Sequence, residues 1–192
     1  MMYDTDARLD RLEEAIKKPS FRQNRGLSNE VGYYIFDYPE SDELIVRERI
    51  DYIRQKNKTT DDYVIQVFDL YDIMIEILKE KGLLEKCFEL EEKSGFDKIS
   101  RNIANRLQVN STNSLFIKYI EERLQERSII FITGIGKCYP IVRSHTVLNN
   151  LTMVIDNVPV VMFYPGKYSG QQLTLFNEIF DDNYYRAFKI VE

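Results

Sequence analysis

Long runs of apolar residues alternate along the chain with segments in which apolar residues recur every three or four positions. Continuous apolar runs are typical of strands that are buried on both faces of a sheet. We predict strands over the ranges 31–38, 62–70, 128–133, 158–166 and 186–191. The strand at 128–133 is the clearest, because β-branched and aromatic residues dominate it and it ends at Gly134.

The segments with helical spacing predict helices between these strands. We expect helices over the ranges 4–18, 41–56, 71–81, 83–93, 97–107, 114–126, 140–151 and 170–180. Asp6 is the expected cap of the first helix, and Pro19 is expected to end it. In the helix at 71–81, Tyr71, Ile75 and Leu78 are expected to share a face.

Strands that alternate with helical crossovers are the pattern of a mostly parallel sheet covered by helices on both faces. We therefore predict an α/β fold of this kind with a helical insert near residues 83–126. The chain has 192 residues and no long linker, so we expect a single domain over residues 1–192.

Composition narrows the class of protein. Hydrophobic residues make up 44% of the chain and charged residues 30%, which is enough for a sizeable core beneath a charged surface. The 31 acidic residues exceed the 26 basic residues and give a net charge of −5. This balance disfavours a protein that coats nucleic acid, because such proteins need a basic face to bind phosphates.

The beginning of the chain is charged rather than apolar, and no stretch reaches the roughly 18 apolar residues of a membrane span. Cys87 and Cys138 lie far apart and form neither a metal-binding spacing nor a disulfide framework. We expect a cytoplasmic protein with reduced cysteines and no contact with a membrane.

The segment after the clearest strand, Gly134-Ile135-Gly136-Lys137, is similar to a phosphate-binding loop. Glycines let backbone N–H groups approach a phosphate, and the lysine adds positive charge. A complete loop has a further glycine five residues before the Gly-Lys pair and a Ser or Thr after the lysine, but this chain has Phe131 and Cys138 there. We favour a simple glycine turn. The alternative is a degenerate, P-loop-like domain that binds ATP as a sensor.

Two acids stand at the ends of predicted strands. Asp37 and Asp69 are placed where they could hold a metal ion beside a nucleotide. Acids at this position also cap the helix that follows the strand. We favour the capping role for both residues.

His145 is the only histidine, which excludes any metal site built from several histidines. There is no G-x-S-x-G motif, and Ser144 directly before His145 is poorly placed to be activated by it. We therefore predict no catalytic residue, no metal site and no cofactor.

Tyrosines outside the predicted strands are candidates for contact with another protein chain, because exposed tyrosines favour protein interfaces. These are Tyr168, Tyr184 and Tyr185. The complete set of predicted ligand or partner contacts is Gly134, Gly136, Lys137, Arg143, His145, Tyr168, Tyr184 and Tyr185. Direct DNA binding through Arg22, Arg25 and the basic residues of 137–143 is a weaker option.

Three stretches together resemble one protein family. They are LDRLEEAIKKPSFRQNRGLSNEVGYYIFDYPESDELIVRERI, FITGIGKCYPIVRSHTVLNNL and VPVVMFYPGKYSGQQLTLFNEIFDDNYYRAF. The chain resembles the BrxB family, small components of the BREX bacteriophage-defence systems of bacteria. The resemblance covers nearly the whole chain, and its motifs are specific jointly although each is weak alone.

The resemblance implies an antiviral role beside other BREX components. These are a PglZ-like protein of the phosphatase family, a BrxC-like ATPase and a PglX-like methyltransferase. The family offers no catalytic residue that can be carried over to this chain. We therefore predict a non-catalytic adaptor that binds the PglZ-like protein and links it to the other components, with direct nucleic-acid binding not expected. The alternative remains the ATP-sensing domain.

Overall fold

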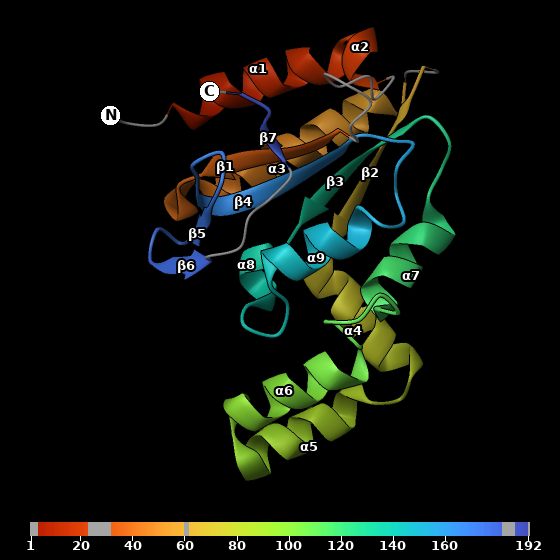
Figure 1. Cartoon of the computed structure of the whole chain (residues 1–192), viewed down its shortest axis with the longest axis vertical. Helices are drawn as coiled ribbons and strands as arrows, with labels where there is room; N and C mark the ends of the chain where they lie inside the picture. Colours follow the sequence, from red (N-terminus) through yellow and green to blue (C-terminus); the bar gives the residue numbers. More distant parts are fainter. Residues whose placement is uncertain (1–3, 23–31, 60–61, 182–186, 192) are drawn as a thin grey trace.

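A twisted sheet of parallel strands forms the centre of the computed structural model, which describes residues 4–22, 32–59, 62–181 and 187–191 (Figure 1). The parallel strands are β1 (Tyr33–Tyr38), β2 (Val64–Asp69), β3 (Ser128–Thr133), β4 (Val160–Tyr168) and the short β7 (Phe188–Lys189). Their order is β2-β3-β4-β1-β7, so the first strand of the chain lies inside the sheet between two of the last. The predicted mostly parallel α/β fold is confirmed.

The alternation of side chains along each strand divides the core into two layers. One face of the sheet packs against α1 (Thr5–Lys17) and α3 (Glu43–Asn57), with Phe36, Phe131 and Phe163 beneath these helices. The short helices α2 (Pro19–Arg22) and η1 (Glu40–Asp42) lie beside them in the chain.

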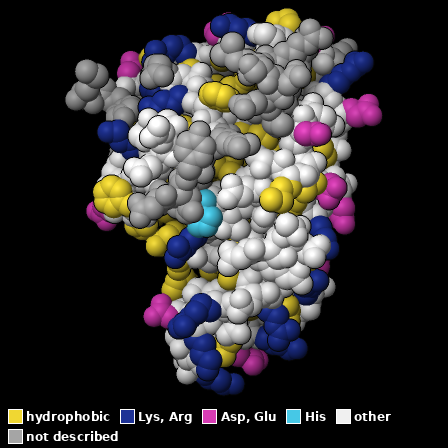
Figure 2. Space-filling model, in the orientation of Figure 1, with side chains coloured by type: hydrophobic (Ala, Val, Ile, Leu, Met, Phe, Trp, Pro, Cys, Tyr) yellow, Lys and Arg dark blue, Asp and Glu magenta, His cyan; other side chains and the backbone are white. Residues whose placement is uncertain are grey.

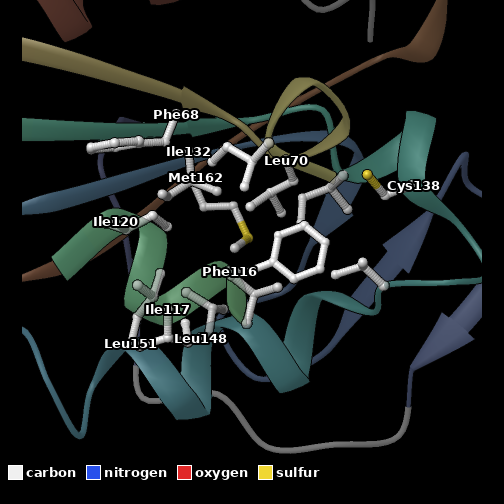
Figure 3. Close-up of a cluster of buried hydrophobic side chains, with 14 of the residues drawn as sticks. Phe68, Leu70, Phe116, Ile117, Ile120, Ile132, Cys138, Leu148, Leu151 and Met162 are labelled. Atoms are coloured by element: carbon white, nitrogen blue, oxygen red, sulfur yellow. The ribbon is translucent and has the colours of Figure 1, made fainter. Parts of the chain in front are cut away.

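The opposite face of the sheet is covered by four helices, α4 (Leu70–Glu80), α7 (Leu115–Arg123), α8 (Ile135–Cys138) and α9 (Ser144–Leu151). Phe116 and Met162 meet in this layer with Cys138 nearby (Figure 3). The strands are apolar on both faces because both faces are covered, which is why their sequences read as continuous apolar runs.

Two helices, α5 (Leu84–Ser94) and α6 (Phe96–Arg106), form a hairpin that projects from the body (Figure 1). We call residues 84–106 the helical arm. None of the side chains of α5 is fully buried, whereas Ile99 and Ile103 of α6 are buried. The predicted insert at 83–126 therefore has two parts, because α7 packs on the sheet and only the arm stands apart.

Several sequence predictions need correction. Residues 170–180 do not form a helix but the antiparallel strands β5 (Leu173–Leu175) and β6 (Ile179–Asp181), which pair with the end of β4. Leu173 and Leu175 are buried on either side of Thr174, a spacing of two that the helical interpretation overlooked. The helix predicted from 140 begins only at Ser144, after the short α8.

Two smaller corrections concern α1 and α4. Asp4 rather than Asp6 caps α1, since its carboxylate accepts the N–H of Ala7. Helix α1 does end before Pro19, as predicted, and α2 begins at that proline. Of the three residues expected to share a face of α4, Leu78 is buried and Tyr71 is exposed, and the buried face is formed by Leu70, Ile73, Met74, Ile77 and Leu78.

Candidate functional site

The parallel strands bring their carboxyl ends to one edge of the sheet, where ligands collect in open α/β folds. Asp69 ends β2 at this edge. Its Oδ1 accepts the backbone N–H groups of Tyr71 at 3.0 Å and Asp72 at 3.2 Å, so it caps α4 as predicted. Its Oδ2 accepts the hydroxyl of Thr133 at 3.2 Å.

Lys137 lies against the same carboxylate. Its Nζ is 2.6 Å from Oδ2 of Asp69, and both side chains are partly shielded from water. The lysine of the phosphate-loop-like segment therefore already has an anionic partner within the chain. A bound phosphate would compete with this carboxylate for Lys137 and would be repelled by it.

The two glycines of this segment are required by packing inside the protein. Gly134 has φ +78°, a left-handed conformation that favours glycine. A Cβ atom there would lie 2.5 Å from Oδ1 of Asp69, and one on Gly136 would lie 2.9 Å from the ring of Phe176. The space beside both glycines is thus filled by the protein's own side chains, as the interpretation of a simple turn requires.

A crevice of about 420 Å³ opens at this edge between α3 and α4. We call it the carboxyl-edge crevice. Two ion pairs lie within it, Arg47 with Glu43 at 2.7 Å and Lys137 with Asp69 at 2.6 Å. The hydroxyl of Tyr38 donates to Glu43, and burial together with this carboxylate raises the pKa of Tyr38. The cation of the phosphate-loop-like segment is therefore neutralised inside the crevice by Asp69.

Asp37, at the end of β1, is fully buried and does not cap the next helix, so that prediction is wrong. Its carboxylate forms an ion pair with Arg8 at 2.6 Å, accepts the N–H of Tyr168 at 2.9 Å and lies 3.6 Å from Nζ of Lys189. A second nitrogen of Arg8 donates to the Asp37 carbonyl. Asp37 therefore connects α1, β4 and β7 to the end of β1.

Cys138 ends α8 and lies inside the core (Figure 3). The pKa of its thiol is raised to about 12, chiefly by burial and also by nearby Asp69, while Lys137 opposes the shift. Because the thiolate is the reactive form, this cysteine has the properties of a packing residue and not of a nucleophile.

Arg143 and His145 lie apart from the crevice. They line a second groove, of about 680 Å³, together with Arg101, Asn105 and other residues of α6. We call it the α6–α9 groove. The structure therefore separates the predicted contact residues into two groups. Arg101 and Asn105 were not found from the sequence, because their nearness to Arg143 depends on how the helical arm folds against the body.

Tyr168 was predicted to contact a partner, and the structure contradicts this. The residue belongs to β4 and is fully buried, and its hydroxyl donates to the carbonyl of Ala187 at 2.7 Å and lies 3.0 Å from that of Gly170. The strand extends past Pro165 and Gly166, where the sequence suggested that it ends. Tyr184 and Tyr185 lie outside the described residues.

The described part of the chain has neither a metal-binding cluster nor a membrane-spanning helix. No group of three or more His, Cys, Asp or Glu side chains there is arranged to hold a metal ion. Within the same ranges, every helix is too short or too polar to cross a membrane.

Comparisons with known proteins agree with one another. Residues 66–190 match the family described as BREX protein BrxB. A BREX protein BrxB of Bacillus cereus (strain H3081.97) is 50% identical over 96% of both chains. A BREX protein BrxB of Escherichia coli O9:H4 (strain HS) is 33% identical over 96% of this chain and 90% of its own. No solved structure matches the chain.

Proposed function

The chain belongs to the BrxB family of BREX proteins, and from this membership we propose that it is a non-catalytic adaptor in a BREX phage-defence complex. In this proposal it binds the PglZ-like phosphatase-family protein. It links that protein to other components, such as the BrxC-like ATPase and the PglX-like methyltransferase.

The observation that carries the proposal is the closed state of the loop after β3. Lys137 is engaged by Asp69, and the space beside Gly134 is taken by the same carboxylate. These contacts favour an adaptor over the alternative, an ATP sensor, because the backbone of a phosphate loop must be open to an anion.

Exposed aromatic side chains on the helical arm support a role in protein contacts. Phe88 of α5 is 53% exposed and Phe96 of α6 is 47% exposed. Large aromatic residues supply much of the binding energy at protein interfaces, since they bury a large area with few rotatable bonds. The arm also stands away from the body, where a partner can reach it (Figure 1).

The test is to mix the purified protein with its PglZ-like neighbour and to measure the mass by size exclusion with light scattering at two salt concentrations. We expect one peak with the summed mass of both proteins. Replacing Phe88 and Phe96 together by Ser should weaken the complex about tenfold or more. Leu44→Ser on α3, which is 68% exposed, is the matched control. Two separate peaks at both salt concentrations would contradict this choice of partner.

The ATP-sensing alternative is tested by calorimetry with ATP and magnesium. We expect no heat of binding at high protein concentration. Binding that Lys137→Ala abolishes would overturn our preference, since it would show that the lysine leaves Asp69 to meet a phosphate.

A further inference from the structure

The α6–α9 groove holds two arginines, Arg101 and Arg143, that form no ion pair with any residue the structure describes, although Asp97 also lines the groove. Arg101 donates through Nε to the carbonyl of Asp97 at 3.0 Å, a bond within α6 that leaves its charge unneutralised. Arg143 makes no hydrogen bond or ion pair with any residue that the structure describes, and the same residues place no carboxylate within 4.0 Å of either guanidinium. His145 lines the same groove.

The chemistry of the groove favours a carboxylate. Guanidinium groups present planar sets of N–H donors that match carboxylates in pairs of parallel hydrogen bonds. The amide side chains of Asn105 and Asn110 line the groove beside them and offer both donors and acceptors, which suit a peptide backbone. A groove of about 680 Å³ has the size of sites that hold short segments or small ligands.

From these contacts we propose that the α6–α9 groove binds an acidic segment, rich in Asp or Glu, of a protein partner. The inference rests on the proposed adaptor function and assigns that function a surface. The occupant would contact the arm through Arg101 and the body through Arg143, and so would connect the two. In Figure 2, Lys and Arg side chains (dark blue) gather over the lower part of the molecule, where the arm lies, and the single histidine (cyan) lies just above it.

A peptide is favoured over nucleic acid as the occupant. The chain carries a net charge of −5, and the helical arm has five acidic and five basic residues, so it carries no net positive charge. A nucleic-acid backbone presents a row of phosphates and needs an extended basic face. The arm has no such extended face, because its acids and bases are equal in number, whereas a short acidic segment can be confined to the two arginines of the groove.

The test uses a fluorescein-labelled hexaglutamate peptide and measures its anisotropy with the full-length chain at low and at physiological salt. We expect saturable binding that Arg143→Glu and Arg101→Glu each weaken about tenfold or more, because each loses charge-assisted hydrogen bonds. Arg54→Glu is the matched control, since Arg54 lines the carboxyl-edge crevice and the substitution changes the charge equally. It should alter affinity by less than about twofold.

Three outcomes would overturn the inference: no binding of the peptide, an equal loss in the Arg54→Glu variant, or tighter, Arg143-dependent binding of a single-stranded oligonucleotide. Circular dichroism of each variant separates lost binding from lost folding.

The same variants, mixed with the PglZ-like protein, separate this inference from the proposed function. If Arg143→Glu leaves the complex intact, the adaptor function stands but the groove is not its binding surface. If the peptide binds but no complex with the PglZ-like protein forms, the groove still binds acidic segments, and the PglZ-like protein is not the partner.

Discussion

The carboxyl edge of the sheet and the helical arm with its groove contain the same kinds of residue in opposite surroundings. At the edge, Lys137 is 2.6 Å from Asp69. In the arm, Arg101 has no carboxylate within ion-pair distance among the described residues. Gly134 at the edge would bring a Cβ against Asp69, whereas Gly82, just before the arm, has nothing within 4 Å.

This difference shows why residue type alone does not locate a binding surface. The Gly-x-Gly-Lys segment has the residues of a phosphate site, but those residues hold β2, β3 and α8 together. The groove has no phosphate-loop-like segment, yet Arg101 and Arg143 have no carboxylate partner among the described residues. We therefore expect substitutions at the carboxyl edge to lower the stability of the protein and substitutions in the groove to leave it nearly unchanged.

The largest effect is expected from Asp37→Ala. The substitution leaves Arg8 without its carboxylate in the core, so it should lower the free energy of unfolding by about 3–5 kcal/mol. Urea denaturation measures the change. Asp97→Ala, in the groove, is the control and should change the free energy by about 0.5 kcal/mol or less. If both variants lost only about 0.5 kcal/mol of unfolding free energy, the carboxyl edge would be no more tightly held by internal contacts than the groove.

The two cysteines should differ strongly in reactivity with Ellman's reagent at pH 8. A pKa of about 12, against an ordinary 9.0, lowers the thiolate fraction of Cys138 roughly a thousandfold. Burial also raises the pKa of Cys87, but this thiol is only half-buried in the arm and should react first. The variant Cys87→Ser isolates the slow thiol.

The raised pKa of Cys138 also predicts a pH dependence of stability. The native state favours the neutral thiol, so this contribution is complete below about pH 9 and is lost as the pH rises towards 12. For the reaction with Ellman's reagent, equal rates for Cys87 and Cys138 would show that the carboxyl edge opens readily to the reagent.

Gly134→Ala should lower the free energy of unfolding by about 2–3 kcal/mol, since it combines an unfavourable φ with a collision against Asp69. Gly82→Ala has a similar φ of +61° in open space and should cost only about 1–2 kcal/mol. Thermal unfolding of both variants isolates the effect of the collision. Equal losses would mean that Asp69 moves away freely.

Lys137→Ala should cost less than about 1 kcal/mol, because its ion pair with Asp69 is partly exposed. Asp69→Ala should cost more, by about 1 kcal/mol, because it also removes the cap of α4. If the proposed PglZ-like partner binds this protein, we expect the Lys137→Ala variant to keep that binding. Loss of that complex would place the carboxyl edge in the interface and contradict the proposed surface.

The smallest effect is expected from Arg143→Ala, which should change the free energy of unfolding by less than about 0.5 kcal/mol. The side chain contributes no hydrogen bond or ion pair to the described part of the fold. Urea denaturation checks this value. A loss above 1 kcal/mol would show that Arg143 is engaged by the protein after all.

The strands of the fold were predictable because burial on both faces leaves a continuous apolar run, as in Ser128–Thr133. The hairpin of β5 and β6 was not, because two short strands of three residues carry too little alternation to outweigh helical spacing. Tyr168 was misplaced for a related reason. The Pro-Gly pair before it suggests a turn, but Gly166 pairs with Leu175 and the strand continues.

The candidate site was predictable only where its residues adjoin in sequence. Gly134 to Lys137 form one segment, so their grouping could be read directly, but their partner Asp69 comes from another strand. Asp37 illustrates the same limit, since its role depends on Arg8 and Lys189 from opposite ends of the chain. Contacts between distant segments decide whether a charge is committed or available.

The position of β1 between β4 and β7 has a consequence for synthesis on the ribosome. This strand is translated early, but Tyr168, whose N–H binds Asp37, follows 131 residues later. Until β4 emerges, β1 is an apolar strand without neighbours, a form that aggregates or binds chaperones. A chain that terminates before residue 160 would remain in that state, so even a late nonsense mutation should yield insoluble protein rather than a stable fragment.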